Sequence, residues 1–163
     1  MSVDKSITIA TLKQELRDCN EYCEKYGWKI SDLNEENLNF TVLMISPVDK
    51  EEYHLAITGD NYPEWPLLID FFDPVTEEKG TKKCYPQGGD SFFHPGLPCI
   101  CNPCSRKSYK KFIESAPHGD WELNSWKTYS EVGTLTKILN ILRAIYGRIS
   151  DPDPNNYRGR MQK

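Results

Sequence analysis

Residues 92–104 constrain the fold of this chain more than any other segment, because three prolines and three cysteines occur within it. The segment reads Phe-Phe-His-Pro-Gly-Leu-Pro-Cys-Ile-Cys-Asn-Pro-Cys. Proline fixes φ and has no backbone N–H, which disfavours a helix here and excludes a central strand. Cysteines in such an open loop perform chemistry or bind metal more often than they pack into a core. The loop therefore predicts a functional site, and the role of its cysteines decides the function.

Length and composition predict one folded domain over residues 1–163. A chain of 163 residues, 38% hydrophobic and 12% aromatic, is long enough to bury a single core. The net charge is −4 and the pI is about 5.4. This acidic balance argues against a nucleic-acid partner, since phosphates favour a basic face.

The N-terminus carries no apolar segment of the kind found in secretory signals. No run of about 18 apolar residues occurs, so no membrane span is expected. We therefore expect a cytoplasmic location, where the six cysteines are mostly thiols, thiolates or metal ligands rather than disulfides.

An amphipathic helix is predicted near the N-terminus. Its apolar positions recur at spacings of three and four and line one face: Ile9, Leu12, Leu16, Cys19, Cys23 and Tyr26. Thr8 and Thr11 are equally good N-caps, and Gly27 suits the left-handed position after the helix. Because Cys19 and Cys23 lie on the apolar stripe, packing is favoured for them over half of a metal site.

Two runs with alternating apolar residues, 38–44 and 53–58, flank a turn at 47–50 and predict an antiparallel hairpin. His54 falls on the face opposite Tyr53 and Leu55, which indicates a solvent-facing strand residue. Residues 67–72 predict a third strand. Residues 83–93 are ambiguous and could include a short edge strand.

The C-terminal part predicts helices. Tyr109, Phe112 and Ile113 indicate a short helix that ends near Pro117, and the apolar residues from 135 to 149 form a strong amphipathic stripe. Asp-Pro-Asp-Pro at 151–154 stops that last helix, and 155–163 is expected to be a flexible tail. Strands followed by helices predict an α+β domain, and the long irregular segment between them is typical of a functional region.

This order of elements resembles the ubiquitin-conjugating enzymes over nearly the whole chain, from about residue 9 to residue 154. The matching motifs are Tyr62-Pro63-Glu64-Trp65-Pro66, His94-Pro95, Ile100-Cys101, Trp126 (or Trp121) and Asp151-Pro152-Asp153-Pro154. The resemblance implies a ubiquitin-conjugating-like fold with an N-terminal helix, an antiparallel four-stranded meander, a long active-site loop and C-terminal helices.

The chain departs from the family pattern in three respects. Gly96 stands where the family has an asparagine. Residues 62–67 correspond to a proline-rich segment of the family that we call the crossing, and Leu67 replaces its last proline. The interval from Gly96 to the first matching cysteine is also short. Cys104 fits the family spacing better, whereas Cys101 fits the local Ile-Cys context.

The resemblance implies a transferase that carries a protein C-terminal acyl group as a cysteine thioester and passes it to an amine of a target protein. The implied reaction requires no cofactor, and the resemblance implies an activating enzyme as a partner. The docking surface for that activator would be the polar face of the first helix, with Lys13, Arg17 and Lys25. The chain is most similar to the bacterial stand-alone conjugating-enzyme-like proteins of short type II CBASS antiphage operons. There such a protein accompanies a cGAS-like nucleotidyltransferase, so the resemblance implies that this nucleotidyltransferase or another carrier protein is the carried group.

Cys101 is the first choice for the thioester nucleophile, followed by Cys104 and then Cys99. Three nearby cations, Arg106, Lys107 and Lys110, could favour a thiolate. Asn102 is a candidate donor to the oxyanion. Candidates for holding or deprotonating the amine are His118, Asp120 and Tyr109. The expected loop-organising residues are His94, Pro95 and Tyr62.

Three alternatives stay open. His94, Cys99, Cys101 and Cys104, with Cys84 in reserve, could form a structural zinc site. The fold could also be a catalytically silent binding module, since fold does not fix function and the asparagine is missing. A thiol–disulfide oxidoreductase is disfavoured, because the Cys101-Asn102-Pro103-Cys104 motif lacks the βαβ context.

Overall fold

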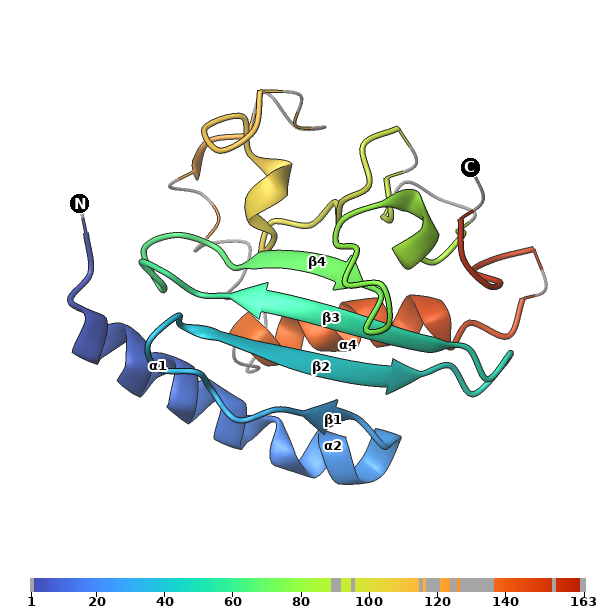
Figure 1. Cartoon of the computed structure of the whole chain (residues 1–163), viewed down its shortest axis with the longest axis horizontal. Helices are drawn as coiled ribbons and strands as arrows, with labels where there is room; N and C mark the ends of the chain where they lie inside the picture. Colours follow the sequence, from blue (N-terminus) through green and yellow to red (C-terminus); the bar gives the residue numbers. More distant parts are fainter. Residues whose placement is uncertain are drawn as a thin grey trace.

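The computed structural model describes residues 2–88, 92–94, 96–114, 116, 121–123, 126, 137–153 and 155–161. These residues form an α+β arrangement, with an N-terminal helical region, a four-stranded antiparallel sheet and a C-terminal helix (Figure 1). The elements are α1 (Lys5–Asp18), α2 (Asn20–Tyr26), β1 (Lys29–Ile30), β2 (Asn39–Ile45), β3 (Glu52–Thr58), β4 (Leu68–Phe72), the 3-10 turns η1 (Lys82–Cys84) and η2 (Arg106–Ser108), and α4 (Lys137–Ile149).

The sheet has the order β1-β2-β3-β4, with every neighbouring pair antiparallel. Val42, Leu55 and Phe71 face one another across β2, β3 and β4, and their side chains are buried. The fourth strand is β1, at the start of the sheet. The described part of the ambiguous segment, residues 83–88, 92 and 93, contains the end of η1 and two isolated bridges but no strand.

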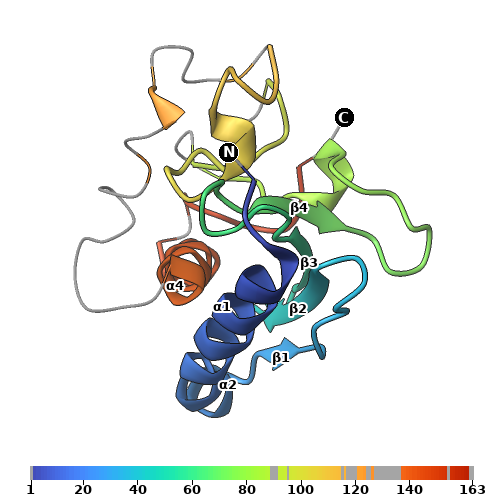
Figure 2. The ribbon, with the colours of Figure 1, turned by 90° about the vertical axis from the view of Figure 1, so that its left-hand side faces the viewer.

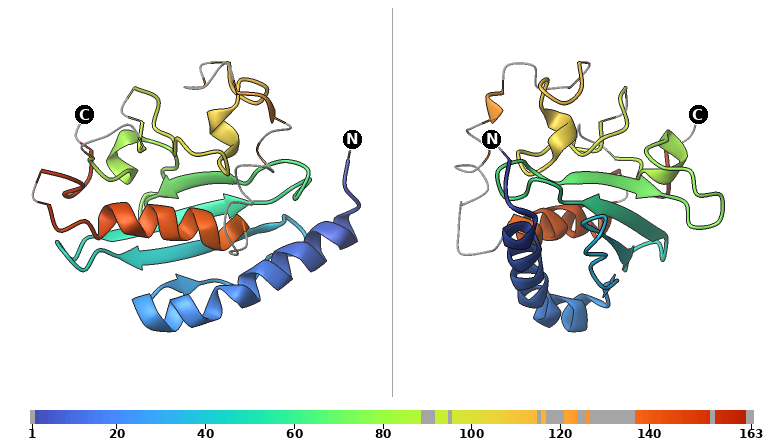
Figure 3. Two further views of the ribbon diagram at one scale, coloured as in Figure 1. Left: turned by 180° about the vertical axis from the view of Figure 1, so that it is seen from behind. Right: turned by 60° about the vertical axis from the view of Figure 1, so that its left-hand side comes forward.

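Helices α1 and α4 contact each other and cover the same face of the sheet, as Figure 2 and the rear view in Figure 3 show. The core between them is apolar, because α4 and the strands direct alternate apolar side chains toward this space. Its fully buried members include Leu12, Met44, Leu55, Ile57, Ile138, Leu142 and Ile145. None of the described helices is both long and apolar enough to cross a membrane.

The N-terminal helix is interrupted at Cys19, which separates α1 from α2, although the sequence predicts one helix. Its N-cap is Asp4, whose carboxylate accepts the N–H of Ser6 at 2.8 Å, so the expected caps at Thr8 and Thr11 are wrong. The hydroxyl of Thr8 is buried and donates to Tyr62 O at 2.6 Å. Gly27 ends α2 with φ of 73°, the left-handed conformation predicted for it.

The structure also bears on the expected positions of Cys19, Cys23 and His54. Cys19 is fully buried and Cys23 is half-buried, as expected for core packing. His54 lies on the outer face of the sheet between Leu43 and Phe72, yet it is only partly exposed because its ring contacts the Phe72 ring at 5.7 Å.

The predicted short helix from Tyr109 to Pro117 differs in the structure. The chain makes a single 3-10 turn at Arg106–Ser108, and the N–H groups of Phe112 and Ile113 then turn back to Tyr109 O. The apolar spacing of this segment reflects packing of a compact turn, since the Phe112 ring lies edge-on to Trp65 at 5.2 Å. Residue 117 lies outside the described residues.

The C-terminal residues 157–161, expected to be part of a flexible tail, pack against the domain. Met161 N–H donates to Tyr85 O at 2.8 Å, and Gln87 N–H donates to Gly159 O at 3.0 Å. Tyr157 is 4% exposed and packs edge-on to Phe93 with ring centroids 5.4 Å apart. We call residues 157–161 the C-terminal strap; it lies beside residues 82–88 (Figure 1).

Candidate active site

The cysteine loop forms a short irregular hairpin above the edge of β4. Phe93 and Ile100 form an antiparallel bridge, and His94 N–H donates to Cys99 O at 2.9 Å. Cys101 N–H donates to Phe92 O at 2.7 Å. Phe93 and Ile100 are both buried, so the hairpin is fixed to the core from below. Two backbone hydrogen bonds thus hold a segment whose prolines prevent a regular ladder.

The three loop cysteines differ in burial and acidity. Cys99 is fully buried, and desolvation raises the pKa of its thiol to about 11. Cys104 is 4% exposed, and burial raises its pKa to about 12. Cys101 is only partly buried. Because the thiolate is the reactive form and needs access, Cys99 and Cys104 are poorly suited to act as nucleophiles, whereas Cys101 remains accessible.

Asn102, the candidate oxyanion donor, is fixed by a local turn. Its side-chain oxygen Oδ1 accepts the N–H of Cys104 at 2.9 Å, and its backbone O accepts the N–H of Ser105 at 2.9 Å. The amide nitrogen Nδ2 has no partner among the described residues and Asn102 is partly exposed. A hydrogen-bond donor one residue from Cys101 is therefore available.

His94 organises the turn that precedes the cysteines. Its ring nitrogen Nδ1 accepts the N–H of Leu97 at 3.1 Å, which closes the His94–Leu97 turn. A Cβ at position 96 would lie 3.3 Å from His94 Cε1, closer than an unstrained contact. Gly96 therefore permits the close approach of the turn to the histidine ring, a role that an asparagine could not fill without a shift.

The cations downstream of the cysteines have different roles. Arg106 is 7% exposed and holds the loop to the crossing, because its guanidinium donates to Pro66 O at 3.1 Å and to Asp60 Oδ1 at 2.8 Å. Its backbone N–H also donates to Leu67 O. The guanidinium of Arg106 is thus bonded to the crossing, whereas the sequence suggested that it stabilises a thiolate.

Lys107 donates to Asp70 Oδ1 at 2.6 Å, and the hydroxyl of Tyr85 donates to the same oxygen at 3.1 Å. The charge of Lys107 lowers the pKa of Cys99 but does not offset the larger effect of desolvation. Lys110 is exposed on the surface. The electrostatic effect of Lys107 on a loop thiol therefore falls on a buried cysteine.

The crossing that begins at Tyr62 supports the loop from the other side. Tyr62 is fully buried and donates to the Glu15 carboxylate, and Trp126 Nε1 donates to Glu64 O at 3.0 Å. The peptide bond between Tyr62 and Pro63 is cis. Tyr62 therefore supports the loop indirectly, by fixing the start of the crossing to Glu15 of α1.

The candidate residues for proton transfer are only partly described. His118 and Asp120 lie outside the described residues, as does Pro95, which was expected to organise the loop. The hydroxyl of Tyr109 donates to Pro103 O at 2.6 Å, and the side chain is 1% exposed. Tyr109 is consequently built into the base of the loop rather than presented to an incoming amine.

The zinc alternative lacks geometric support. Among the described residues, which include all six cysteines and His94, no three His, Cys, Asp or Glu side chains gather closely enough to hold a metal ion. Cys84, the reserve ligand, instead lies against the hydroxyl of Thr81 at 3.4 Å.

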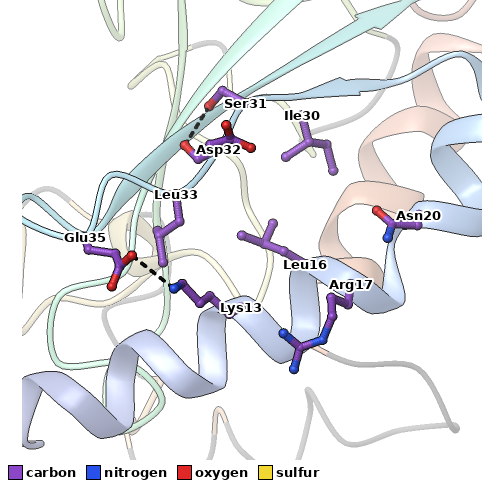
Figure 4. A pocket seen from close by; sticks show the side chains of 9 residues that line it. All are labelled: Lys13, Leu16, Arg17, Asn20, Ile30, Ser31, Asp32, Leu33 and Glu35. Carbon is purple, nitrogen blue, oxygen red and sulfur yellow. Dashed lines mark hydrogen bonds and ion pairs between the residues drawn. The ribbon is translucent and has the colours of Figure 1, made fainter.

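A polar cavity of about 410 Å³ lies away from the cysteine loop, between the end of α1 and the chain that follows β1 (Figure 4). Its lining includes apolar side chains and side chains of both charges, and Lys13 is paired to Glu35 at 3.0 Å. The lining residues are Lys13, Leu16, Arg17, Asn20, Ile30, Ser31, Asp32, Leu33 and Glu35. Two of the three cations expected on the docking face of the first helix thus border this cavity.

Comparison of the sequence with models of known protein families finds no match, and comparison with curated proteins finds none either. The likeness to conjugating enzymes therefore rests on the motifs, the order of the elements and the loop described above.

Proposed function

We propose that this protein is a ubiquitin-conjugating-like transferase that carries an acyl group as a thioester on Cys101. The observation that carries this proposal is the difference between the loop thiols: Cys101 is accessible, while Cys99 and Cys104 are buried thiols of raised pKa. A loop that presents one thiol and buries its neighbours suits a single nucleophile.

The arrangement of elements supports a ubiquitin-conjugating-like fold for the whole domain. An N-terminal helix, a four-stranded antiparallel sheet, a proline-rich crossing, a cysteine loop and a C-terminal helix follow in the family's order. Arg106 and Ser105 join the crossing to the loop, since Arg106 N–H bonds Leu67 O and Ser105 pairs with Leu67. The two motifs of the resemblance are therefore neighbours in space.

In the proposed reaction, the Cys101 thiolate attacks the thioester carbonyl that links the carried protein to its activating enzyme. A carbon–sulfur bond forms to Cys101, and the activator's thiolate leaves. An amine of the target then attacks the Cys101 thioester, loses its proton to a base, and expels the Cys101 thiolate. Asn102 Nδ2 is the proposed donor to the oxyanion of both steps, and His118 the proposed base.

The proposed carried group is the C-terminus of a cGAS-like nucleotidyltransferase, in the cytoplasm of a bacterium during antiphage defence. The proposed docking surface for the activating enzyme is the cavity between the end of α1 and the chain that follows β1, which we call the α1 cavity. Lys13 and Arg17 line it together with the apolar side chains of Leu16 and Leu33. Both partners follow from the family resemblance of the sequence.

The test is intact mass spectrometry of the protein co-expressed with its neighbouring genes. We expect an adduct that a thiol reagent removes from the wild type, and an ester-linked adduct that resists the reagent in Cys101→Ser. Cys104→Ala and Cys23→Ser are the controls, one for a buried loop thiol and one for a partly exposed thiol outside the loop. An adduct that persists unchanged in Cys101→Ala would remove Cys101 as the nucleophile.

A catalytically silent binding module is the second candidate. It is favoured by Gly96, which fits closely against His94 and leaves the family's asparagine position without a side-chain amide. In that case Cys101→Ser would leave phage protection in vivo intact while a disrupted α1 cavity, as in Arg17→Glu, would abolish it. Loss of protection in Cys101→Ser with a normally folded protein would exclude this second candidate.

A further inference from the structure

Two serines in the turn after the cysteines, Ser105 and Ser108, are both fully buried but make different hydrogen bonds. Ser105 Oγ has no hydrogen-bond partner among the described residues. Ser108 Oγ lies 3.1 Å from Ile100 O, 3.0 Å from Asn102 O and 3.1 Å from Asn102 N. Two hydroxyls with equal burial in one turn therefore have unequal structural roles.

The three partners of Ser108 lie directly on either side of Cys101. The hydroxyl proton is shared between the carbonyl oxygens of residues 100 and 102, and the oxygen accepts the N–H of Asn102. These groups occur where prolines prevent a strand ladder, so no neighbouring strand satisfies them. One side chain thus fixes the backbone both before and after the candidate nucleophile.

We propose that Ser108 is the positioning residue of this site: it fixes the Cys101 thiol and the Asn102 amide relative to each other. The inference rests on the proposed thioester function. Asn102 has its side-chain direction set by its own turn to Cys104 N–H, and Ser108 holds the backbone from which that turn starts. Reactive groups need support of this kind, since a misplacement of about 1 Å can cost about 100-fold in rate.

The positioning can be measured without any partner protein, by amide hydrogen exchange followed by NMR. In Ser108→Ala we expect the Asn102 N–H to lose at least about tenfold of its protection, while amides of β3 such as Leu55 are unchanged. Ser105→Ala is the matched control, because it removes a hydroxyl of equal burial that makes no hydrogen bond to a described residue. Equal protection of Asn102 in the two variants would overturn the proposal.

The catalytic consequence is measured as discharge of a preformed Cys101 thioester to an amine. We expect Ser108→Ala to slow the discharge step by about 10- to 100-fold with little change in the KM for the amine, and Ser105→Ala to match the wild type. Ser108→Thr, which keeps the hydroxyl, should recover most of the rate. Discharge in Ser108→Ala at the wild-type rate would overturn the positioning role.

The two proposals fail in distinguishable ways. A wild-type protein that never carries a thioester contradicts the proposed function, while the exchange of Asn102 still decides whether Ser108 fixes the loop. A wild-type thioester with normal discharge in Ser108→Ala contradicts only the role of Ser108.

Discussion

The hydroxyl of Tyr62 donates to the carboxylate of Glu15 at 2.7 and 2.8 Å, and so joins the crossing after β3 to the first helix. Glu15 Oε1 also accepts the N–H of Ile138 at 3.0 Å, in the first turn of α4. A carboxylate at a helix N-terminus is stabilised by the helix dipole and by the unpaired N–H groups there. One buried carboxylate therefore links α1, α4 and the base of the site.

Removing the Tyr62 hydroxyl should destabilise the fold. We expect Tyr62→Phe to lower the free energy of unfolding by about 1–3 kcal/mol, because it leaves the buried Glu15 carboxylate with one donor fewer. Urea denaturation followed by circular dichroism measures the change. Tyr22→Phe is the control: Tyr22 is half-buried, and its hydroxyl has no hydrogen bond to a described residue. An unchanged midpoint in Tyr62→Phe would show that the Glu15 contact contributes no net stability.

At position 106, arginine and lysine should differ in their effect on stability although they carry the same charge. Its guanidinium reaches Pro66 O and both Asp60 Oδ1 and Asp60 O, and it lies 5.4 Å from the Trp65 ring centroid. A lysine cannot reproduce this planar set of donors, so Arg106→Lys should cost roughly 1–3 kcal/mol. Asp60→Asn should cost under about 1 kcal/mol, since the Asp60 carboxylate is half exposed. Chemical denaturation of both variants tests the order, and an equal loss would contradict it.

The regular part of the fold could be predicted from the sequence because its burial follows simple periods. Alternation in Phe40, Val42 and Met44 matches the buried face of β2, and the stripe through Ile138 and Leu142 matches α4. The two-residue strand β1 is too short to alternate, and the break at Cys19 leaves the apolar stripe unchanged. Neither the strand β1 nor the break at Cys19 therefore leaves a pattern in the sequence from which it could be predicted.

The candidate site could be located from the sequence, but its internal roles could not be ranked. Three cysteines in one proline-rich loop look alike in sequence. Their pKa values depend on burial and on nearby charges that only the folded chain brings together, such as those of Asp70 and Lys107 near Cys99. The sequence does not reveal that Ser108 and Arg106 hold the loop in place, since a serine and an arginine in a polar segment are usually solvated. Their hydrogen bonds to Ile100 O and Pro66 O appear only in the folded chain.

The C-terminal strap predicts a glycine requirement at position 88. A Cβ there would collide with the ring of Tyr157, which is 4% exposed and packs on Phe93. Gly88→Ala should therefore lower the free energy of unfolding by about 1–3 kcal/mol through overpacking. Thermal unfolding measures the loss, and the double variant with Tyr157→Ala should show a smaller additional cost of Gly88→Ala than the wild type does.

Gly147 is the matched control for this glycine prediction. It lies within α4 and a Cβ there would meet nothing within 4 Å. Gly147→Ala should be neutral or stabilising by up to about 1 kcal/mol, because alanine favours the helix. A loss of equal size in Gly147→Ala and Gly88→Ala would show that the strap does not explain the effect.

The loop thiols should react in the order of their access. At pH 8 we expect iodoacetamide to modify Cys101 in the native protein at least about tenfold faster than Cys99 or Cys104, since both of these are buried and their pKa values are raised. Peptide mapping by mass spectrometry gives the rates, and labelling in urea should make all three similar. Faster native labelling of Cys104 than of Cys101 would transfer the nucleophile assignment to Cys104.

Buried thiols also make stability depend on alkaline pH. The pKa of Cys104 is about 12 in the folded protein, whereas an unfolded thiol has a pKa of about 8.5. Since the folded value is raised, the contribution to stability is complete below pH 8.5 and is lost as pH rises toward 12. Between pH 8.5 and 10.5 this one thiol should cost about 2–3 kcal/mol. Guanidinium denaturation at several pH values should therefore show a shallower alkaline loss in Cys104→Ala than in the wild type, and parallel curves would mean that the Cys104 thiol ionises without unfolding.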